Sequence, residues 1–414
     1  MASLGYRHIG LMGKFVCAFR GRRDSYQVPL ALAEAALLDQ FITDAYALPW
    51  VKTLAKLGPQ SVRAKVSFRS EPDLPVELVR CLWGTTLVEH LRHRLGCAPT
   101  MTFNKLDRHF SRAAARRAAR NKTHLFLYSP YAWEAFTARY PHTPRKILFQ
   151  YHPHPQLESR ILAEDRARYP NVGEPSPRAG APPWPEKFLR RERDCWKHAD
   201  FIFCASSFTK RSLIEAGCNE GRCCIVPYGV QLPATAEVEP SSESFQAIFV
   251  GSGGQRKGLH HLLLAWQKAS LPASSKLTVV CRMIDRGIEE LVAATPGVEL
   301  RRGVTEAELG RLYAGSSLFV MPSLAEGFGQ VYLEALAHGC PALGTPNTCL
   351  PDIGAEADGV FLVTPGNVDE LTGQLESLAR SLVGNRTVRA AARACAAKFT
   401  WPSFREALRQ HLVS

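Results

Sequence analysis

Residues 319–341 read FVMPSLAEGFGQVYLEALAHGCP, and this stretch decides the fold class of the chain. Its opening apolar run predicts a buried strand over Ser317–Met321. Proline and glycine interrupt regular structure between Pro322 and Gly329, which predicts a turn there. Apolar residues then recur at helical spacing over Val331–His338. A strand, a tight turn and a helix in this order are typical of a βα unit in a parallel α/β sheet.

Two carboxylates in this stretch, Glu326 and Glu334, have seven residues between them. Gly327, Phe328 and Gly329 place bare backbone amides at the helix start, where the helix dipole attracts anions. Carboxylates accept paired hydrogen bonds from vicinal hydroxyls, as they do from ribose in dinucleotide sites. The pattern therefore predicts one site for a sugar, a phosphate and a ribose. In the alternative interpretation, Glu334 is a solvated helix residue and Glu326 is an N-terminal cap.

A second glycine-rich turn lies upstream, where residues 249–258 read FVGSGGQRKG. An apolar strand runs into this turn, and the sequence LHHLLLAW begins a helix directly after it. Glycine lets backbone amides approach an anion closely, and two adjacent basic side chains supply charge for a diphosphate. An ordinary strand–turn–helix joint with incidental basic residues is the alternative. The candidate phosphate-binding residues of this turn are Gly251, Ser252, Gly253, Arg256 and Lys257.

Short apolar runs alternate with helical patterns along the whole chain, which predicts parallel sheets built from βα units. A helix is expected over Val28–Leu38. Residues 169–186 are rich in proline and glycine and predict a loop, whereas the polar residues 232–244 predict an interdomain linker. Two doubly wound domains joined near residue 235 are the simplest architecture. The expected strands are Lys14–Phe19, Gln40–Tyr46, His124–Tyr128, Lys146–Tyr151, Asp200–Ala205, Cys224–Tyr228, Phe245–Val250, Lys276–Cys281, Ser317–Met321, Pro341–Gly344 and Val360–Val363.

The positive charge of the chain is unevenly placed. Its 414 residues include 51 basic and 38 acidic side chains, a formal net charge of +13. Residues 1–150 hold 23 basic and 10 acidic residues, whereas residues 151–230 hold 12 and 10, and residues 231–414 hold 16 and 18. The whole excess therefore lies in the first third. This asymmetry indicates an acceptor or partner that is anionic or lies on an anionic surface.

Composition excludes several classes of protein. Hydrophobic residues make up 46% and charged residues 21% of the chain, which excludes a mainly disordered, collagen-like or coiled-coil protein. Charges interrupt every apolar stretch before the roughly 18 residues that a membrane-spanning helix needs. The run Ile9–Phe19 contains Lys14 and is followed by arginines, so we interpret it as a strand and not as a signal peptide. The 12 cysteines form no CxxC pair, which favours reduced thiols in a cytoplasmic protein.

Residues 105–122, KLDRHFSRAAARRAARNK, are rich in alanine and predict a helix. Four arginines recur every four residues and so form one basic stripe along it. Docking onto anionic lipid headgroups and an ordinary solvated face are equally supported interpretations. Nucleic-acid binding is disfavoured, because no aromatic residues interleave with the basic ones. The arginines of the stripe are Arg108, Arg112, Arg116 and Arg120.

The residues from Glu326 to Glu334 resemble the E-x7-E motif of retaining glycosyltransferases with the GT-B fold, especially glycosyltransferase family 4. The similarity is strong over residues 190–404 and weaker before them. By this resemblance, Glu326 contacts hydroxyls of the donor sugar, Glu334 holds the ribose, and Lys257 neutralises the diphosphate. The backbone from Gly327 to Gly329 would lie against sugar and phosphate. Further matching segments are WKHADFIFCASSFTKRSLIEAG at 196–217, IVPYGV at 225–230, TPNTCLPDI at 345–353 and KFTWPSF at 398–404.

The resemblance implies an α/β chain with the GT-B fold, in which two Rossmann-like, doubly wound domains face each other across a cleft. An N-terminal acceptor-side domain is expected at residues 1–232 and a C-terminal nucleotide-sugar-binding domain at 233–399. A final helix at 400–414 would pack back on the first domain. One position departs from the family pattern, because Ser252 stands where the family usually has an arginine. Arg256 is the candidate replacement for that missing positive charge.

The first-domain side of the cleft is expected to follow the strand that ends near Tyr151, because ligand clefts form at the carboxyl ends of parallel strands. There the sequence reads HPHP. By resemblance, His152 faces the donor sugar, with His154 as the second choice. Two surface imidazoles stiffened by prolines are the alternative. The acceptor-side candidates after the first strand are Gly21, Asp24, Tyr26 and Gln27.

The resemblance implies a retaining, hexosyl-type glycosyltransferase with a UDP- or GDP-linked sugar as donor and a glycan or lipid-linked acceptor. The acceptor would attack on the face that the leaving group departs from, with the donor phosphate helping to remove its proton. No D-x-D pair occurs in the chain, so we expect no essential metal and no other cofactor. The protein is expected in the cytoplasm, with peripheral docking on the inner face of the membrane. The alternatives are a non-catalytic nucleotide-sugar-binding protein of this fold, or another GT-B enzyme such as a sugar-nucleotide epimerase.

Overall fold

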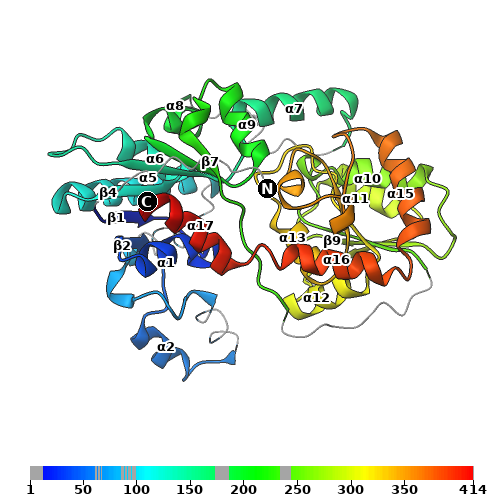
Figure 1. Cartoon of the computed structure of the whole chain (residues 1–414), viewed down its shortest axis with the longest axis horizontal. Coiled ribbons are helices and arrows are strands. Elements are labelled where there is room, and N and C mark those ends of the chain that lie inside the picture. The colour runs from blue at the N-terminus through cyan, green and yellow to red at the C-terminus, as the bar shows by residue number, and fades with distance from the viewer. Residues whose placement is uncertain are drawn as a thin grey trace.

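The protein folds around two separate parallel sheets that lie side by side along the long axis of the molecule (Figure 1). The computed structural model describes residues 13–413, apart from 61–62, 64–65, 67, 85–87, 89–90, 92–94, 96–98, 173–185 and 234–243. Most of the expected loop at 169–186 and of the expected linker at 232–244 therefore lies outside the described residues. The start of the expected strand at Ile9–Phe19 also lies outside the described residues.

The first sheet has seven strands in the order β3-β2-β1-β4-β5-β6-β7, and all neighbours run parallel. The order reverses at β1, as in doubly wound folds, and such reversal points are where ligands bind. Its central strands are completely buried, because helices cover both faces. The strands are β1 (Phe15–Ala18), β2 (Leu38–Thr43), β3 (Val79–Cys81), β4 (His124–Tyr128), β5 (Lys146–Gln150), β6 (Phe201–Cys204) and β7 (Cys223–Ile225).

The second sheet has six parallel strands in the order β10-β9-β8-β11-β12-β13, with its reversal at β8. The carboxyl ends of β8 and β11 carry the two glycine-rich turns that the sequence marks. Both turns therefore lie at the same edge of this sheet. The strands are β8 (Gln246–Val250), β9 (Lys276–Val280), β10 (Val298–Arg301), β11 (Leu318–Val320), β12 (Ala342–Gly344) and β13 (Val360–Leu362).

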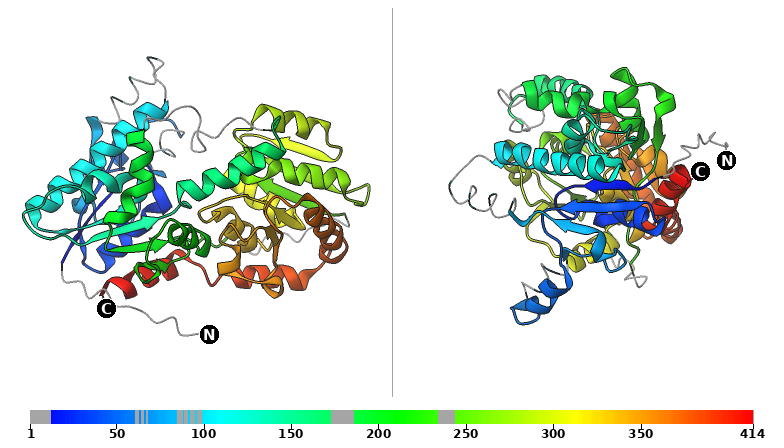
Figure 2. Two further views of the ribbon diagram at one scale, coloured as in Figure 1. Left: turned by 90° about the horizontal axis from the view of Figure 1, so that it is seen from above. Right: turned by 90° about the vertical axis from the view of Figure 1, so that its left-hand side faces the viewer.

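Helices cover the first sheet on both sides, with α5 and α6 on one side and α1 and α17 on the other (Figure 2). Helix α7 reaches from the first domain to α10 of the second domain. The helices built on the first sheet are α1 (Gln27–Glu34), α2 (Pro49–Ala55), α5 (Pro99–Asn121), α6 (Ser129–Phe136), α7 (Pro155–Arg168), α8 (Glu186–Asp194) and α9 (Ser207–Glu215). The remaining helices are α10 (Leu259–Lys268), α11 (Arg286–Ala294), α12 (Glu306–Gly315), α13 (Gln330–Ala337), α14 (Leu350–Ile353), α15 (Val368–Leu382), α16 (Arg386–Ala396) and α17 (Trp401–Val413).

Each of the eleven expected strand segments overlaps a strand of the structure, which confirms the α/β class. Two strands were not expected, β3 and β10, and both lie at sheet edges. The helix expected over Val28–Leu38 is wrong at its end. It stops at Glu34 because Ala36 adopts a left-handed φ of 57°, and Leu38 already begins β2.

The last helix, α17, returns to the first domain and packs on α1 (Figure 1). Arg405 Nε lies 2.9 Å from Glu34 Oε1, and the ring of Phe404 lies 6.1 Å from that of Phe149. The chain thus crosses between the domains twice, and the two crossings pair where Val230 N donates to Phe399 O over 2.9 Å. Among the described helices, none is both long enough and apolar enough to cross a bilayer. No disulfide joins the described cysteines.

Candidate functional site

The two glycine-rich turns of the second domain contact each other directly. Leu324 N donates to Arg256 O over 2.9 Å. Gly258, with a φ of +69°, lies so close to the Pro322 carbonyl that a Cβ atom would overlap it. Only glycine combines this left-handed conformation with so close an approach. The parallel sheet therefore brings the two motifs, about 70 residues apart in sequence, into one site.

Three charged side chains from these turns form what we call the interface cluster, Arg256, Lys257 and Glu326. Arg256 Nη1 lies 3.0 Å from Glu326 Oε2, and Lys257 Nζ bonds to the same oxygen. Arg256 Nη1 also donates to Ala325 O over 2.9 Å. Burial opposes ionisation of Glu326, yet the charges of Arg256 and Lys257 outweigh it and lower the pKa of the carboxyl to about 2. The cluster holds two cations in place around one ionised carboxylate.

Glu334 lies in a different environment from Glu326. It projects from α13 toward α12, where Tyr313 and the like-charged Glu306 are its neighbours. Burial and the charge of Glu306 raise the pKa of Glu334, and the Tyr313 hydroxyl only partly opposes this effect. Among the described residues, no direct contact joins Glu334 to the interface cluster. The two carboxylates of the motif are therefore not equivalent, because one is held ionised by cations and the other is disfavoured as an ion.

The upstream turn uses two of its backbone amides internally. Gly251 N donates to Val280 O over 3.0 Å, and Gly253 N donates to Met283 O over 2.8 Å. These amides extend the sheet, so they are not open to a phosphate in this structure. Ser252 lies exposed between them. The positive charge near this turn comes from Arg256 and Lys257, which follow it in a short 3-10 helix over Gln255–Lys257.

The first domain supplies the opposite wall of the site. Gly327 lies against the backbone of Tyr151 and His152, and a Cβ atom on it would overlap the Tyr151 carbonyl. The Gly327 carbonyl accepts hydrogen bonds from Ser206 Oγ at 2.6 Å and Thr209 Oγ1 at 2.9 Å, both at the start of α9. The turn that carries Glu326 is thus fastened to the first domain. This contact brings His152 to the loop beside Glu326.

The two histidines of the HPHP segment have different environments. His154 is 1% exposed and caps α7, and its Nε2 lies 2.8 Å from Arg193 O. Its backbone amide donates to Ser212 Oγ over 2.8 Å. These contacts indicate a structural role for His154. The ring of His152 lies against that of Tyr151 in a tilted arrangement, 3.8 Å between centroids and 50° between planes, next to Gly327. Of the two, the structure places His152 at the site.

The aromatic residue of the motif links the turn to the interdomain crossing. Phe328 is buried, and its ring meets Tyr228 edge-on at 5.3 Å. Gly329 has a φ of +88° and begins α13, a conformation that favours glycine. The backbone from Gly327 to Gly329 therefore passes between the two domains.

Residues after β1 and β7 complete the site, and two of them, Arg23 and Tyr228, were not expected. The guanidinium of Arg23 lies 4.0 Å from the ring centre of Tyr151, and Tyr228 Oη donates to Asp24 Oδ2 over 3.0 Å. Asp24, Ser25 and Tyr26 all have left-handed φ values, of 46°, 48° and 63°. Such strain is common at functional sites. The sequence marked Asp24, whereas only the tertiary structure reveals Arg23 and Tyr228.

The other acceptor-side candidates serve the fold. The ring of Tyr26 is buried against Phe41 and Tyr46, at 5.7 and 5.3 Å between centroids. Gln27 is buried and accepts from Arg405 Nη1 over 2.6 Å. Gly21 N donates to Asp44 Oδ1 over 2.9 Å. Among these candidates, Asp24 alone has a described polar contact to a residue of the domain interface, Tyr228.

A buried polar cluster joins the domains behind Lys257. Asp165 of α7 lies 3.1 Å from His260 Nε2 and 2.7 Å from His261 Nε2, and Gln255 Nε2 donates to it over 2.5 Å. Burial disfavours the charged carboxylate, yet both imidazoles bond to it, and the pKa of Asp165 is lowered. Asp165, His260 and His261 are the one group among the described residues that could hold a metal ion. Their mutual contacts already explain the arrangement as an interdomain tie.

The arginines of the stripe on α5 have different environments in the structure. Arg108 pairs with Glu134 at 3.3 Å and is only partly exposed. Arg112, Arg116 and Arg120 are exposed along the same helix. Arg117, which lies beside the stripe, pairs with Asp39 of β2 at 2.8 Å.

Comparison with known proteins agrees with this architecture. The family model described as "Glycosyl transferases group 1" matches residues 244–381. An MMP alpha-(1->4)-mannosyltransferase of Mycolicibacterium hassiacum is 34% identical over 127 residues, which cover 30% of this chain and 31% of that protein. The sulfoquinovosyl transferase SQD2 of Arabidopsis thaliana is 30% identical over 157 residues, covering 37% and 30%. The matched part spans less than a third of the length of these relatives.

Solved structures extend the likeness to almost the whole chain. A sucrose-phosphate synthase from Thermosynechococcus elongatus superposes with a TM-score of 0.64 at 17% identity, covering 96% of this chain and 98% of that one. HepE of Anabaena, in complex with UDP and glucose, gives a TM-score of 0.58 at 14% identity with the same coverage. At this identity the likeness concerns the fold. Residues 244–381 of the second domain therefore match the group 1 glycosyl transferase model, and the whole chain has the GT-B fold and resembles glycosyltransferase family 4.

Proposed function

We propose that this protein is a retaining glycosyltransferase, which moves a hexose from a UDP- or GDP-linked donor to a glycan or lipid-linked acceptor. The observation that carries the proposal is the interface cluster, in which Arg256 and Lys257 meet Glu326 directly beside His152 of the other domain. A diphosphate needs fixed cations, and a sugar needs a fixed hydrogen-bond acceptor. The relatives include a mannosyltransferase and a sulfoquinovosyl transferase, which supports a hexose-type donor.

The leaving diphosphate is the part of the reaction that most needs stabilisation. Negative charge gathers on it as the sugar–phosphate bond breaks, and Lys257 and Arg256 would stabilise that charge. Both cations are largely buried, with side-chain exposures of 13% and 22%, so their field is weakly screened. Arg256 supplies the charge that Ser252 lacks. Glu326 holds the two cations in position before the donor arrives and offers its oxygens to the sugar hydroxyls.

The acceptor would lie on the first-domain side of the interface. Asp24 accepts the Tyr228 hydroxyl there, and burial raises the pKa of Asp24. Arg23 stacks on Tyr151 next to His152. We assign these residues to positioning the acceptor hydroxyl, with the donor phosphate taking its proton. No step of this scheme uses a metal ion.

A panel of UDP- and GDP-sugars with glycan and lipid-linked acceptors tests the proposal. We expect acceptor-dependent release of a nucleoside diphosphate with at least one donor. Glu326→Ala should abolish the release, whereas Asp369→Asn, which removes an exposed carboxylate of the same domain, should leave it unchanged. Donor binding without release would favour the non-catalytic alternative, and conversion of the sugar without an acceptor would favour an epimerase.

A further inference from the structure

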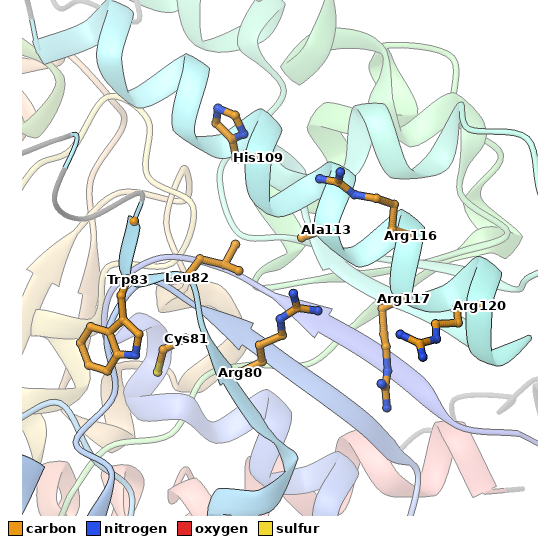
Figure 3. A pocket seen from close by; sticks show the side chains of 10 residues that line it. Arg80, Cys81, Leu82, Trp83, His109, Ala113, Arg116, Arg117 and Arg120 are labelled. Atoms are coloured by element: carbon orange, nitrogen blue, oxygen red, sulfur yellow. The ribbon is translucent and has the colours of Figure 1, made fainter. Parts of the chain in front are cut away.

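A hollow with an unusual concentration of arginine lies far from the interface cluster, between the edge strand β3 and helix α5 (Figure 3). Its volume is about 670 Å³. We call it the outer pocket. Figure 3 shows arginines from both elements around it, with Trp83 at one end. The residues that line it are Arg80, Cys81, Leu82, Trp83, Gly84, His109, Ala113, Arg116, Arg117 and Arg120.

Three of the four arginines that line the outer pocket have no counter-ion among the residues that the structure describes. Arg117 is neutralised by Asp39, with bonds of 2.8 and 3.1 Å. In the part of the chain that the structure describes, no carboxylate pairs with Arg80, Arg116 or Arg120. Cations gathered in this way repel one another unless an anion lies between them. The lining thus supplies three open positive charges and no open negative one.

The geometry of the outer pocket favours a phosphate group. Guanidinium groups bind phosphate oxygens in pairs, which makes arginine the usual residue for this recognition. Beside the arginines, Leu82 and Trp83 form an apolar part of the lining. A ligand that fits such a lining carries a phosphate next to an apolar group.

The neighbouring surface identifies the source of that phosphate. Helix α2 projects from the body of the first domain (Figure 1). Its Trp50 lies 6.3 Å from Trp83 between ring centres, so the protrusion joins the outer pocket. Trp50, Leu54 and Leu57 are 57%, 59% and 86% exposed. Exposed apolar side chains beside basic ones are typical of surfaces that lie at a membrane interface.

We propose that the outer pocket binds the phosphate of an anionic lipid headgroup, while Trp50 and Leu54 of α2, and Leu57 just after it, enter the adjacent bilayer surface. The proposal replaces the uniform stripe expected from the sequence with a defined site. Arg116 and Arg120 belong to it, together with Arg80 from another element. Arg108 does not, because it is not among the lining residues and its Nε lies 3.3 Å from Glu134 Oε1. The site lies outside the domain interface, so its test needs no sugar transfer and its failure leaves the proposed enzymatic function untouched.

Sedimentation of the full chain with lipid vesicles tests the proposal. Vesicles of phosphatidylcholine are compared with vesicles that also contain phosphatidylglycerol. We expect Arg80→Gln/Arg116→Gln/Arg120→Gln to weaken binding to the anionic vesicles by about a hundredfold, since each basic residue contributes about fivefold. A control variant, Arg286→Gln/Arg311→Gln/Arg380→Gln, removes the same charge from exposed positions of the second domain. This variant should retain most of the binding to anionic vesicles. Equal loss in both variants would overturn the site, because net charge alone would then explain binding.

Two further measurements distinguish binding of a lipid headgroup from binding of a soluble phosphate. Leu54→Ser/Leu57→Ser keeps every charge and should weaken vesicle binding at least tenfold, with an unchanged melting temperature. Glycerol phosphate, measured by calorimetry, should bind the protein far more weakly than the vesicles do. If glycerol phosphate binds tightly through the three arginines and the serine variant keeps full vesicle binding, the lipid assignment is wrong. Absence of binding to anionic vesicles would overturn it as well.

Discussion

The interface cluster and the outer pocket both gather cations, yet they do so in opposite ways. In the interface cluster, Arg256 and Lys257 share the buried carboxylate of Glu326, and Arg256 Nε also lies 3.8 Å from Glu158 Oε1, so the charges are paired before any ligand arrives. In the outer pocket, Arg80, Arg116 and Arg120 are exposed and pair with no carboxylate of the described chain.

This difference in pairing affects how each site can select its anion. Buried, paired cations are fixed in direction and weakly screened by salt, so recognition there depends on geometry. Exposed, unpaired cations attract any anion over a longer range, and salt screens them strongly. The first arrangement suits a donor diphosphate held during a reaction, whereas the second suits reversible docking on a charged surface.

The largest expected effect comes from removing a cation of the interface cluster. Lys257→Ala should lower kcat/KM for transfer by about 10² to 10³, as loss of a fixed donor at a developing charge usually does. Arg256→Ala should lower it at least tenfold if Arg256 compensates for Ser252. Steady-state kinetics measures both, with Lys268→Ala on the exposed face of α10 as the control. Wild-type rates for Arg256→Ala would remove Arg256 from the site.

The interface cluster and the outer pocket should also differ in how strongly salt weakens their binding of anions. Raising NaCl from about 50 to about 500 mM should weaken binding to anionic vesicles at least tenfold, because exposed charges are screened beyond a few ångströms at high salt. Affinity for the nucleotide-sugar donor should change less than threefold over the same range. Vesicle sedimentation and donor titration calorimetry measure the two responses. An equal salt dependence of both would contradict the distinction between paired and open cations.

A smaller effect is expected on the pH dependence of stability. The pKa of Glu326 is lowered to about 2 in the folded protein from an ordinary value of 4.5. Its contribution to stability is therefore fully present above pH 4.5 and is lost as the pH falls toward 2. We expect the melting temperature of the wild type to approach that of Glu326→Gln as the pH falls from 6 to 3. A difference that stays constant would mean that Glu326 does not titrate in this range.

The smallest expected effect is that of chelation. Since the proposed chemistry relies on Lys257 and Arg256, excess EDTA should leave the transfer rate unchanged. Added Zn²⁺ or Mn²⁺ should not raise the rate either. A rate lost on chelation and restored by one metal would direct attention to Asp165, His260 and His261, the described group able to hold an ion.

The apolar runs of the sequence were enough to place eleven of the thirteen strands that the structure describes. The two missed strands, β3 with VRC and β10 with VELR, are short edge strands with partly exposed side chains. An edge strand is covered on fewer sides than a central one, so it needs no continuous apolar run. The periodicity that reveals buried strands is therefore absent from them.

The candidate site was predictable where a residue lies in a recognisable motif after a strand, and not where only contacts between distant segments bring a residue to the site. Glu326, Lys257 and His152 follow strands, and the parallel sheets bring such positions to the domain interface. Arg23 and Tyr228 join the site only through contacts to other elements. The separate environment of Glu334, beside Tyr313 and Glu306, also depends on how α12 packs against α13.

The sequence by itself determined the α/β class, the two glycine-rich turns and the excess of positive charge in the first third of the chain. These properties follow from local periodicity and composition, which no packing can change. Only the tertiary structure decided which cations are paired and which are open. Pairing depends on distances of a few ångströms between segments far apart in sequence, such as the 2.8 Å between Arg117 Nε of α5 and Asp39 Oδ2 of β2. The fold therefore divides the excess charge that the sequence counts into arginines paired with carboxylates, such as Arg117, and open arginines around the outer pocket.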